Sequence, residues 1–137
     1  MEIIRRETDY ALRCLLYLGK QTPNELISVK TISEAENLPY ELLRKVFQRM
    51  TKAGIVESIR GKQGGFRLAI DPEAITMRSV LDAVQGPVVV NRCVSDKQCC
   101  PNQKVCQFHQ GICGLQDQIT SLLEQATLQN FLLQDHS

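Results

Sequence analysis

The chain has 137 residues, 43% of them hydrophobic, and its 16 basic and 15 acidic side chains leave a net charge of +1. This length fits one domain, and the hydrophobic content excludes a globally disordered chain. No segment approaches the ~20 apolar residues of a membrane span, and the first residues do not resemble a secretory signal, so we expect a cytoplasmic protein without a membrane partner.

The first helix is predicted from the helical spacing of apolar residues between Tyr10 and Leu18. Thr8 or Asp9 is placed to cap this helix, and the turn-rich residues 19–26 end it. Cys14 lies among the apolar residues, and we expect it to be a small buried hydrophobe.

A helix-turn-helix arrangement follows. Ser28 is predicted to cap a short second helix that runs to Ala35, and residues 37–39 form a turn. A third helix begins near Pro39, runs to about Ala53 and is closed by Gly54. The residues that we expect it to bury are Leu42, Leu43, Val46, Phe47 and Met50.

Beyond the third helix the pattern changes to that of a β-hairpin. Residues 55–59 and 66–70 are predicted strands, joined by a turn at residues 61–65 that contains Lys62. A hairpin directly behind a helix-turn-helix is the wing of a winged helix, and its position here favours that interpretation over an ordinary hairpin. Gly64 and Gly65 let the backbone approach a surface closely.

The C-terminal half contains two more predicted helices, at residues 76–85 and from Leu115 to about Ala126. We expect the apolar side of the second to form a dimer interface with part of the first helix, with packing on its own chain as the alternative. Its apolar residues are Leu115, Ile119, Leu122, Leu123 and Ala126. The predicted fold is mainly α with a small β-hairpin wing. It comprises a winged helix-turn-helix at residues 1–86, a cysteine-rich loop at residues 87–114, and a dimerisation helix and tail at residues 115–137.

Basic side chains gather in the first half of the chain. Residues 1–70 carry 12 basic and 8 acidic side chains, residues 71–137 carry 4 and 7, and residues 44–67 carry seven and one. Such a stripe is typical of phosphate binding, although an ordinary solvated surface explains the charge equally well. The candidate DNA contacts lie on the polar side of the third helix and on the wing: Glu41, Arg44, Lys45, Gln48, Arg60, Lys62, Gly64 and Gly65.

Six cysteines in a reduced compartment indicate metal or redox chemistry rather than disulfides. Five of them follow the pattern Cys93-x5-Cys99-Cys100-x5-Cys106-x2-His109-x3-Cys113. Structural zinc sites usually pair cysteines two to four residues apart, whereas a cluster accepts thiolates from separated positions. The spacing therefore favours an iron–sulfur cluster, and a zinc site or a cofactor-free thiol switch stays open. His109 shares a face with Cys106 and Cys113 if a helix has begun there.

No nucleophile–base pair, phosphate-binding loop or pair of carboxylates stands out in the sequence. We therefore expect neither an enzyme nor a small-molecule substrate. The cysteine spacing also differs from that of an iron–sulfur electron carrier.

Several stretches have a recognisable combination of residues. They are Thr-Asp-Tyr-Ala-Leu-Arg at 8–13, Lys-Ala-Gly-Ile-Val-Glu-Ser at 52–58, Arg-Gly-x-x-Gly-Gly-Phe at 60–66, Val-Leu-Asp-Ala-Val at 80–84 and Thr-Leu at 127–128. With these the chain resembles the Rrf2 family of winged-helix transcription regulators, which has IscR-like and NsrR-like members. The resemblance covers nearly the whole chain.

The resemblance implies a homodimer that binds near-palindromic promoter DNA and usually represses transcription. In cluster-binding members three loop cysteines hold the iron, here Cys93, Cys99 (or Cys100) and Cys106. IscR-like members add a histidine, matched by His109, and bind a two-iron (2Fe-2S) cluster. NsrR-like members recruit an aspartate from the first helix of the other subunit, matched by Asp9, and bind a four-iron (4Fe-4S) cluster. We favour His109 and the two-iron cluster.

The chain departs from the family pattern in its loop. The Cys99-Cys100 doublet leaves the middle ligand ambiguous, because the step from Cys99 to Cys106 is one residue longer than usual, and Cys113 is an additional thiol. Some family members have no cluster and sense through thiols or partner proteins. The sequence therefore predicts a repressor that senses redox state, nitric oxide or iron–sulfur status through a cluster, with a cluster-free or zinc-binding regulator as the alternative.

Overall fold

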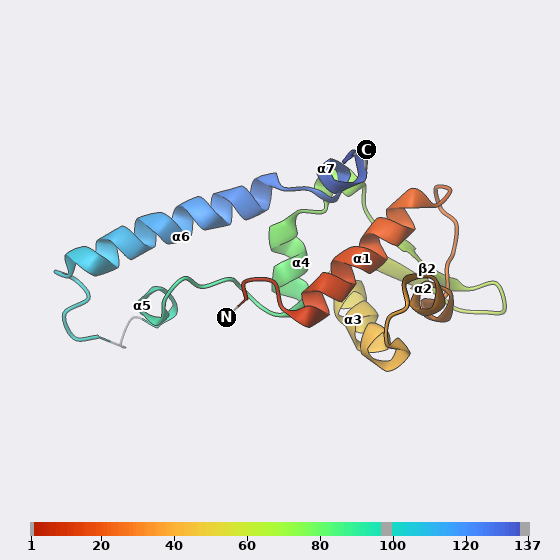
Figure 1. Ribbon diagram of the computed structural model, residues 1–137, viewed down its shortest axis with the longest axis horizontal. Helices are drawn as coiled ribbons and strands as arrows, with labels where there is room; N and C mark the ends of the chain where they lie inside the picture. The colour runs from red at the N-terminus through yellow and green to blue at the C-terminus, as the bar shows by residue number, and fades with distance from the viewer. Residues whose placement is uncertain (1, 97–99, 135–137) are drawn as a thin grey trace.

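The structure is a computed structural model that describes residues 2–96 and 100–134, so the predicted ligand Cys99 lies outside the described residues. A body of short helices and one hairpin carries a long helix that extends away from it (Figure 1). The elements in chain order are α1 (Arg6–Lys20), α2 (Val29–Glu36), α3 (Tyr40–Lys52), β1 (Val56–Ile59), β2 (Gly65–Leu68), η1 (Pro72–Ala74), α4 (Met77–Val84), α5 (Arg92–Ser95), α6 (Gln107–Gln125) and α7 (Leu128–Leu132).

Helix α1 begins earlier than predicted. Its N-cap is Arg5, and the amide of Asp9 already donates to the Arg5 carbonyl at 2.9 Å, so the prediction of a cap at Thr8 or Asp9 is wrong. The reason is tertiary: Thr8 is fully buried, and its hydroxyl donates to Oε1 of Gln85 at 2.6 Å. The helix also continues to Lys20, into the segment predicted to be a turn.

Helices α2 and α3 confirm the helix-turn-helix. The Ser28 hydroxyl accepts from the Thr31 amide at 3.1 Å and caps α2, and Asn37 ends that helix at a left-handed φ of 54°. Gly54, at φ 78°, follows α3 as predicted. Leu42 is only half-buried, because a rotation of about 100° per residue places it at the edge of the apolar face. The other predicted residues are buried: Leu43, Val46, Phe47 and Met50.

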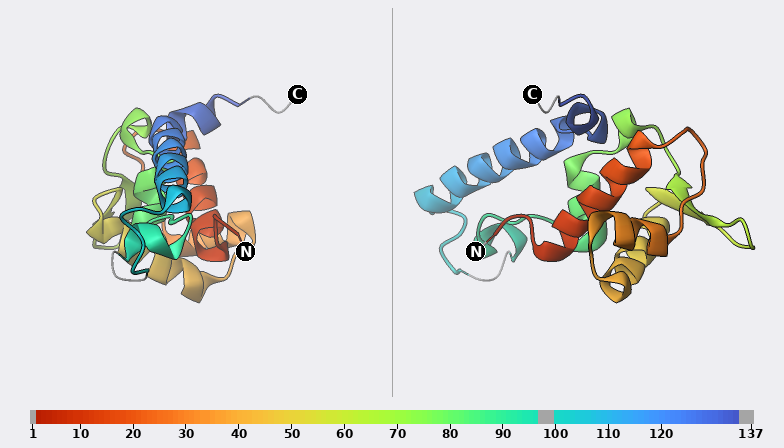
Figure 2. Two further views of the ribbon diagram at one scale, coloured as in Figure 1. Left: turned by 90° about the vertical axis from the view of Figure 1, so that its left-hand side faces the viewer. Right: turned by 45° about the vertical axis from the view of Figure 1, so that its right-hand side comes forward.

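The wing is attached to the body at its base. Strands β1 and β2 pair antiparallel, with Val56 opposite Leu68. Ile27, just before α2, adds a bridge: its amide donates to the Phe66 carbonyl at 2.9 Å, and its carbonyl accepts from the Phe66 amide at 2.8 Å. The Phe66 ring packs on Phe47 of α3, with centroids 4.6 Å apart. The wing therefore projects from the body while its base rests on α3 (Figure 2).

Helix α6 begins at Gln107 rather than at the predicted Leu115. The Cys106 side chain is its N-cap and accepts from the His109 amide at 3.4 Å, a role for which a cysteine gives no sequence signal. The predicted loop also contains the short helix α5. None of the helices in the described ranges is long and apolar enough to cross a bilayer.

The far end of α6 is fixed to the body by backbone hydrogen bonds. The Met77 amide donates to the Ala126 carbonyl at 2.7 Å, and the Leu128 amide donates to the Ile75 carbonyl at 2.8 Å. Arg78 of α4 also pairs with Glu124 of α6. Leu128 begins α7, whose packing against α1 places α7 over the body (Figure 1). Helix α7 was not predicted as a separate element.

Candidate DNA-binding surface and candidate metal centre

Most of the predicted DNA contacts line one groove between the start of α2, the exposed side of α3 and the wing. Its volume is about 480 Å³, and the predicted residues that line it are Arg44, Gln48, Arg60, Gly64 and Gly65. Glu41 and Lys45 are exposed on α3, and Lys62 is exposed on the wing, but these three do not line the groove. The fold thus brings α3 and the wing to one face of the molecule.

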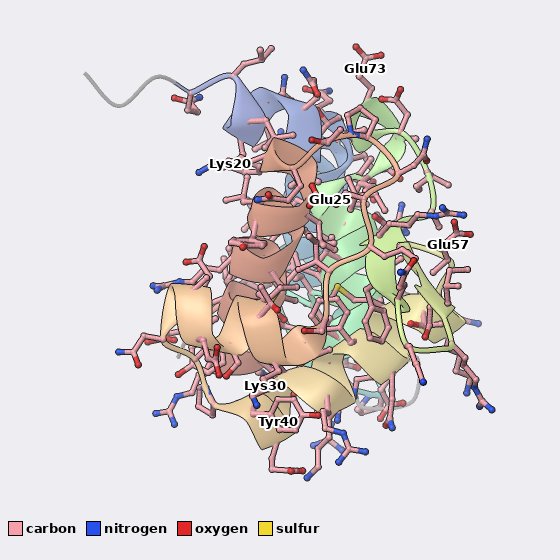
Figure 3. The ribbon with its side chains drawn as sticks, turned by 90° about the vertical axis from the view of Figure 1, so that its right-hand side faces the viewer. Lys20, Glu25, Lys30, Tyr40, Glu57 and Glu73 are labelled. Atoms are coloured by element: carbon pink, nitrogen blue, oxygen red, sulfur yellow. The ribbon has the colours of Figure 1, made fainter. Side chains whose placement is uncertain are left out.

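The groove also contains Ser28, Lys30 and Tyr40, which the sequence analysis did not single out. Lys30 and Tyr40 lie next to each other at the end of the molecule formed by α2 and α3 (Figure 3). The Arg44 guanidinium lies 5.9 Å from the centre of the Tyr40 ring and donates to Glu41 at 3.4 Å. These contacts hold Arg44 at the groove wall.

The basic stripe is less uniform than the sequence indicated. Arg67 pairs with Glu57 across the wing, and Arg49 pairs with Glu7 of α1 at 2.7 Å, so these two arginines carry carboxylate partners. Four of the seven basic side chains have no ion-pair partner within residues 2–96 and 100–134: Lys45, Lys52, Arg60 and Lys62. Arg49 is 43% exposed but contacts Glu7 of α1 and Val84 of α4 instead of lining the groove, so it is left out of the candidate DNA surface.

The candidate metal ligands lie at the other end of the molecule, on α5 and the start of α6 (Figure 1). Cys93 is in α5, Cys106 caps α6, and His109 and Cys113 follow on α6. His109 Nε2 lies 3.4 Å from Cys113 Sγ, which confirms that the two side chains share a helical face. The cysteines at 93, 100, 106 and 113 are half-buried free thiols.

Side-chain amides hold the cysteine-rich segment against α6. Gln103 donates to the carbonyls of Cys93 and Asp96, the latter at 3.2 Å. Gln116 of α6 donates to the Val88 carbonyl and accepts from the Val90 amide, each at 2.8 Å. Gln103 therefore links two parts of the segment, and Gln116 anchors residues 88–90 to α6.

The structure does not assemble a complete metal site from the residues that it describes. In residues 2–96 and 100–134, no three histidine, cysteine, aspartate or glutamate side chains come together as a metal site. Asp9, the alternative fourth ligand, pairs with Arg13 at 3.3 Å on α1. The donor types themselves, thiolate and imidazole, suit iron in a cluster and also zinc.

Cys14 is separate from these thiols. It is fully buried in α1, as predicted for a small hydrophobe. Burial and the nearby charge of Glu36 raise the pKa of its thiol to about 12. A thiol with such a high pKa stays protonated and is a poor nucleophile and a poor ligand at neutral pH.

Helix α6 presents an apolar row to solvent. Phe108, Leu115 and Leu122 are 65%, 44% and 65% exposed and are spaced seven residues apart. Leu123, predicted to belong to this row, instead lines a small cavity against α4 together with Gln116 and Thr120. The helix thus has one side on α4 and an apolar row on another, in which Phe108, Leu115 and Leu122 are exposed and Ile112 and Ile119 are half-buried.

Comparison with known proteins identifies this architecture. The Rrf2 family model, described as an iron-dependent transcriptional regulator, matches residues 4–134. The chain belongs to the Rrf2 family. It is accordingly a DNA-binding transcriptional regulator with the winged-helix fold of that family, and not an enzyme.

The chain is similar to several kinds of regulator. The regulator NsrR of Bacillus licheniformis is 32% identical over 131 residues, which are 94% of this chain and 92% of that protein. IscR of Vibrio cholerae is 31% identical over 66% of this chain and 52% of its own. The solved structure of CymR, the global cysteine regulator of B. subtilis, has a TM-score of 0.75 at 25% identity and covers 96% of this chain and 97% of its own.

Proposed function

We propose that the protein is a homodimeric repressor that binds promoter DNA and senses redox state, nitric oxide or iron–sulfur status through a cluster in its cysteine-rich segment. The DNA-binding part rests on the groove between α3 and the wing. With α3 in the major groove, Arg44 is placed to bond guanine and Glu41 to accept from cytosine. Arg60 on the wing would then enter the adjacent minor groove, where a narrow groove attracts arginine.

The sensing part rests on the donor set. His109 lies one helical turn beyond Cys106, the N-cap of α6. Helix α6 contacts α5, which contains Cys93. Cysteine thiolates hold iron–sulfur clusters, and histidine replaces cysteine in some two-iron clusters. We assign Cys93, Cys99, Cys106 and His109 as the ligands of a two-iron cluster. The alternates are Cys100 for the middle cysteine, and Cys113 or the partner's Asp9 for the fourth ligand.

The cluster, when bound, would fix the distance between α5 and the start of α6, because its ligands come from both elements. Its loss would release these elements, while Gln103, in the turn before α6, would still donate to the carbonyls of Cys93 and Asp96. Metal binding is coupled to the ordering of its ligands. The ligand side chains can therefore be present in the chain and come together only when the cluster binds. The description of the family as iron-dependent supports this assignment.

The homodimer rests on the apolar row of α6. Rows with seven-residue spacing pair helices of two chains, and the three exposed and two half-buried apolar side chains of this row gain free energy when a partner covers them. Two winged helices held by paired α6 helices would present two α3 helices to one duplex. Half-sites on one face lie about 34–36 Å apart, which makes spacing between subunits a determinant of operator choice.

The test of the sensing part is anaerobic purification followed by an absorption spectrum and counts of iron and acid-labile sulfide. The expected result is a coloured protein with about two irons and two sulfides per subunit. Alanine variants of Cys93, Cys99, Cys106 and His109 should each lower the iron content, and the Cys14→Ala variant is the matched control that should not. A colourless protein that contains no iron and resists reconstitution would contradict the proposal.

A zinc-binding or cofactor-free thiol regulator is the second candidate. The thiol switch is favoured by the observation that the described thiols of Cys93, Cys100, Cys106 and Cys113 are free and half-buried rather than gathered into a site. Zinc gives a colourless protein with metal, whereas a thiol switch gives a metal-free protein whose DNA affinity changes when its thiols are oxidised. The same metal analysis therefore separates all three cases.

A further inference from the structure

We propose that Arg49 is a positioning residue that couples the cysteine-rich segment to helix α3. This inference rests on the proposed function, because it concerns how the state of that segment alters DNA binding. Arg49 belongs to the helix that carries the DNA contacts, yet its exposed side chain contacts neighbouring helices instead of lining the groove. Its nearest polar partners come from α1 and from the end of α4.

The guanidinium of Arg49 makes two contacts through one nitrogen. Nη1 lies 2.7 Å from Oε2 of Glu7 and 3.0 Å from the carbonyl oxygen of Val84. Val84 is the last residue of α4, where carbonyl groups lack partners within the helix. Arg49 thus satisfies the C-terminal end of α4, and its positive charge suits the negative end of the helix dipole.

The next residue along the chain, Gln85, is held equally closely. Its Oε1 accepts from the Thr8 hydroxyl at 2.6 Å and from the Arg5 amide at 3.0 Å, and its Nε2 donates to the Ile3 carbonyl at 2.8 Å. The two residues at the end of α4 are therefore connected to α3, to α1 and to the N-terminal segment. Figure 1 shows the chain start beside the segment that leaves α4.

The cysteine-rich segment begins directly after this end of α4. Gly86, at a left-handed φ of 95°, turns the chain away from α4 toward Cys93. A displacement of that segment acts first on the end of α4. Because Arg49 joins this end to α3, the displacement reaches the helix that carries Arg44 and Gln48. Packed helices respond to such a change by shifting as units rather than by bending continuously.

The test measures the ratio of operator affinities of the cluster-loaded and cluster-free protein, for the wild type and for Arg49→Gln. Residues that carry such coupling typically alter it by 0.5–2 kcal/mol, so the ratio should move toward one by roughly 2- to 30-fold. Cluster content and the salt dependence of binding should stay unchanged, because Arg49 contacts neither the cluster nor phosphates. Lys20→Gln, which removes one positive charge from the exposed end of α1, is the matched control and should keep the wild-type ratio.

Glu7→Gln supplies a second variant that keeps the bond from Arg49 to Val84 and removes only the ion pair, and it should reduce the ratio less. A wild-type ratio that differs from one and that Arg49→Gln leaves unaltered overturns the role of Arg49 while the proposed function stands. A salt slope that falls by about 0.9 in Arg49→Gln shows a phosphate contact and overturns it as well. A wild-type ratio of one at every operator overturns the sensing function itself.

Discussion

Replacement of Gly65 by alanine is expected to loosen the wing and to destabilise the whole protein. Gly65 has a φ of 155°, and an added Cβ would lie 2.8 Å from both the carbonyl carbon and the oxygen of Ile27. Those are backbone atoms of the bridge to Phe66, so they cannot move without breaking its two hydrogen bonds. Each bond contributes about 1 kcal/mol, and the backbone strain adds about 1–3 kcal/mol. The free energy of unfolding should therefore fall by roughly 3–5 kcal/mol.

This loss can be converted into a melting temperature. An unfolding entropy of about 2.1 cal/mol/K per residue gives about 0.3 kcal/mol/K for the chain, or about 3.5 °C per kcal/mol. The Gly65→Ala variant should thus melt roughly 10–17 °C below the wild type at the same protein concentration. Gly111→Ala is the control, because an added Cβ there has no neighbour within 4 Å and alanine favours helix. A Gly65→Ala protein that melts with the wild type and binds operator DNA equally well would refute the reasoning.

Three further predictions concern other parts of the molecule. Leu122→Asp should yield monomers in sedimentation experiments, because it places a charge in the apolar row of α6, whereas Ser121→Asp, on the far side of that helix, should leave dimers. The pKa of Cys14 is raised from 9.0 to about 12. Stability should therefore fall as the pH rises from about 9 to 12, because the unfolded thiol ionises first, and Cys14→Ala should lack this component in denaturant titrations. Arg44→Ala should relax base preference, whereas Lys62→Ala should lower the salt slope by about 0.9; identical effects in titrations at several salt concentrations would contradict this division.

The winged helix could be predicted from the sequence because local signals specify it. Ser28, Gly54 and the glycines of the wing mark the boundaries of α2, α3 and the hairpin, and all of these signals act within a few residues. The start of α6 could not be predicted, because its cap is the cysteine side chain of Cys106. As a result, the first two members of the apolar row, Phe108 and Ile112, were assigned to a loop.

The sequence predicted which residues belong to the candidate sites, but not how those residues are arranged in space or which others join them. Lys30 and Tyr40 join the groove only because α2 and α3 fold together, and nothing in their local sequence distinguishes them from other surface residues. Arg49 was counted with the basic stripe because periodicity does not reveal a partner 42 residues away in Glu7. For the same reason Thr8 was mistaken for a helix cap, because its burial against Gln85 depends on a residue far along the chain.

The anchoring of the cysteine-rich segment has a consequence for how such regulators diversify. Among the described residues from 85 to 127, none belongs to the buried core, which resumes at Leu128. The segment is closed across its base by Gln116, whose amide bonds Val88 and Val90. Doubling the length of a closed loop costs only about 0.6 kcal/mol. The residues between Asn91 and Cys106 can therefore be exchanged or lengthened without unfolding the winged helix. One scaffold can in this way accept sensors of unrelated chemistry. A chimera that carries a foreign loop should still melt cooperatively.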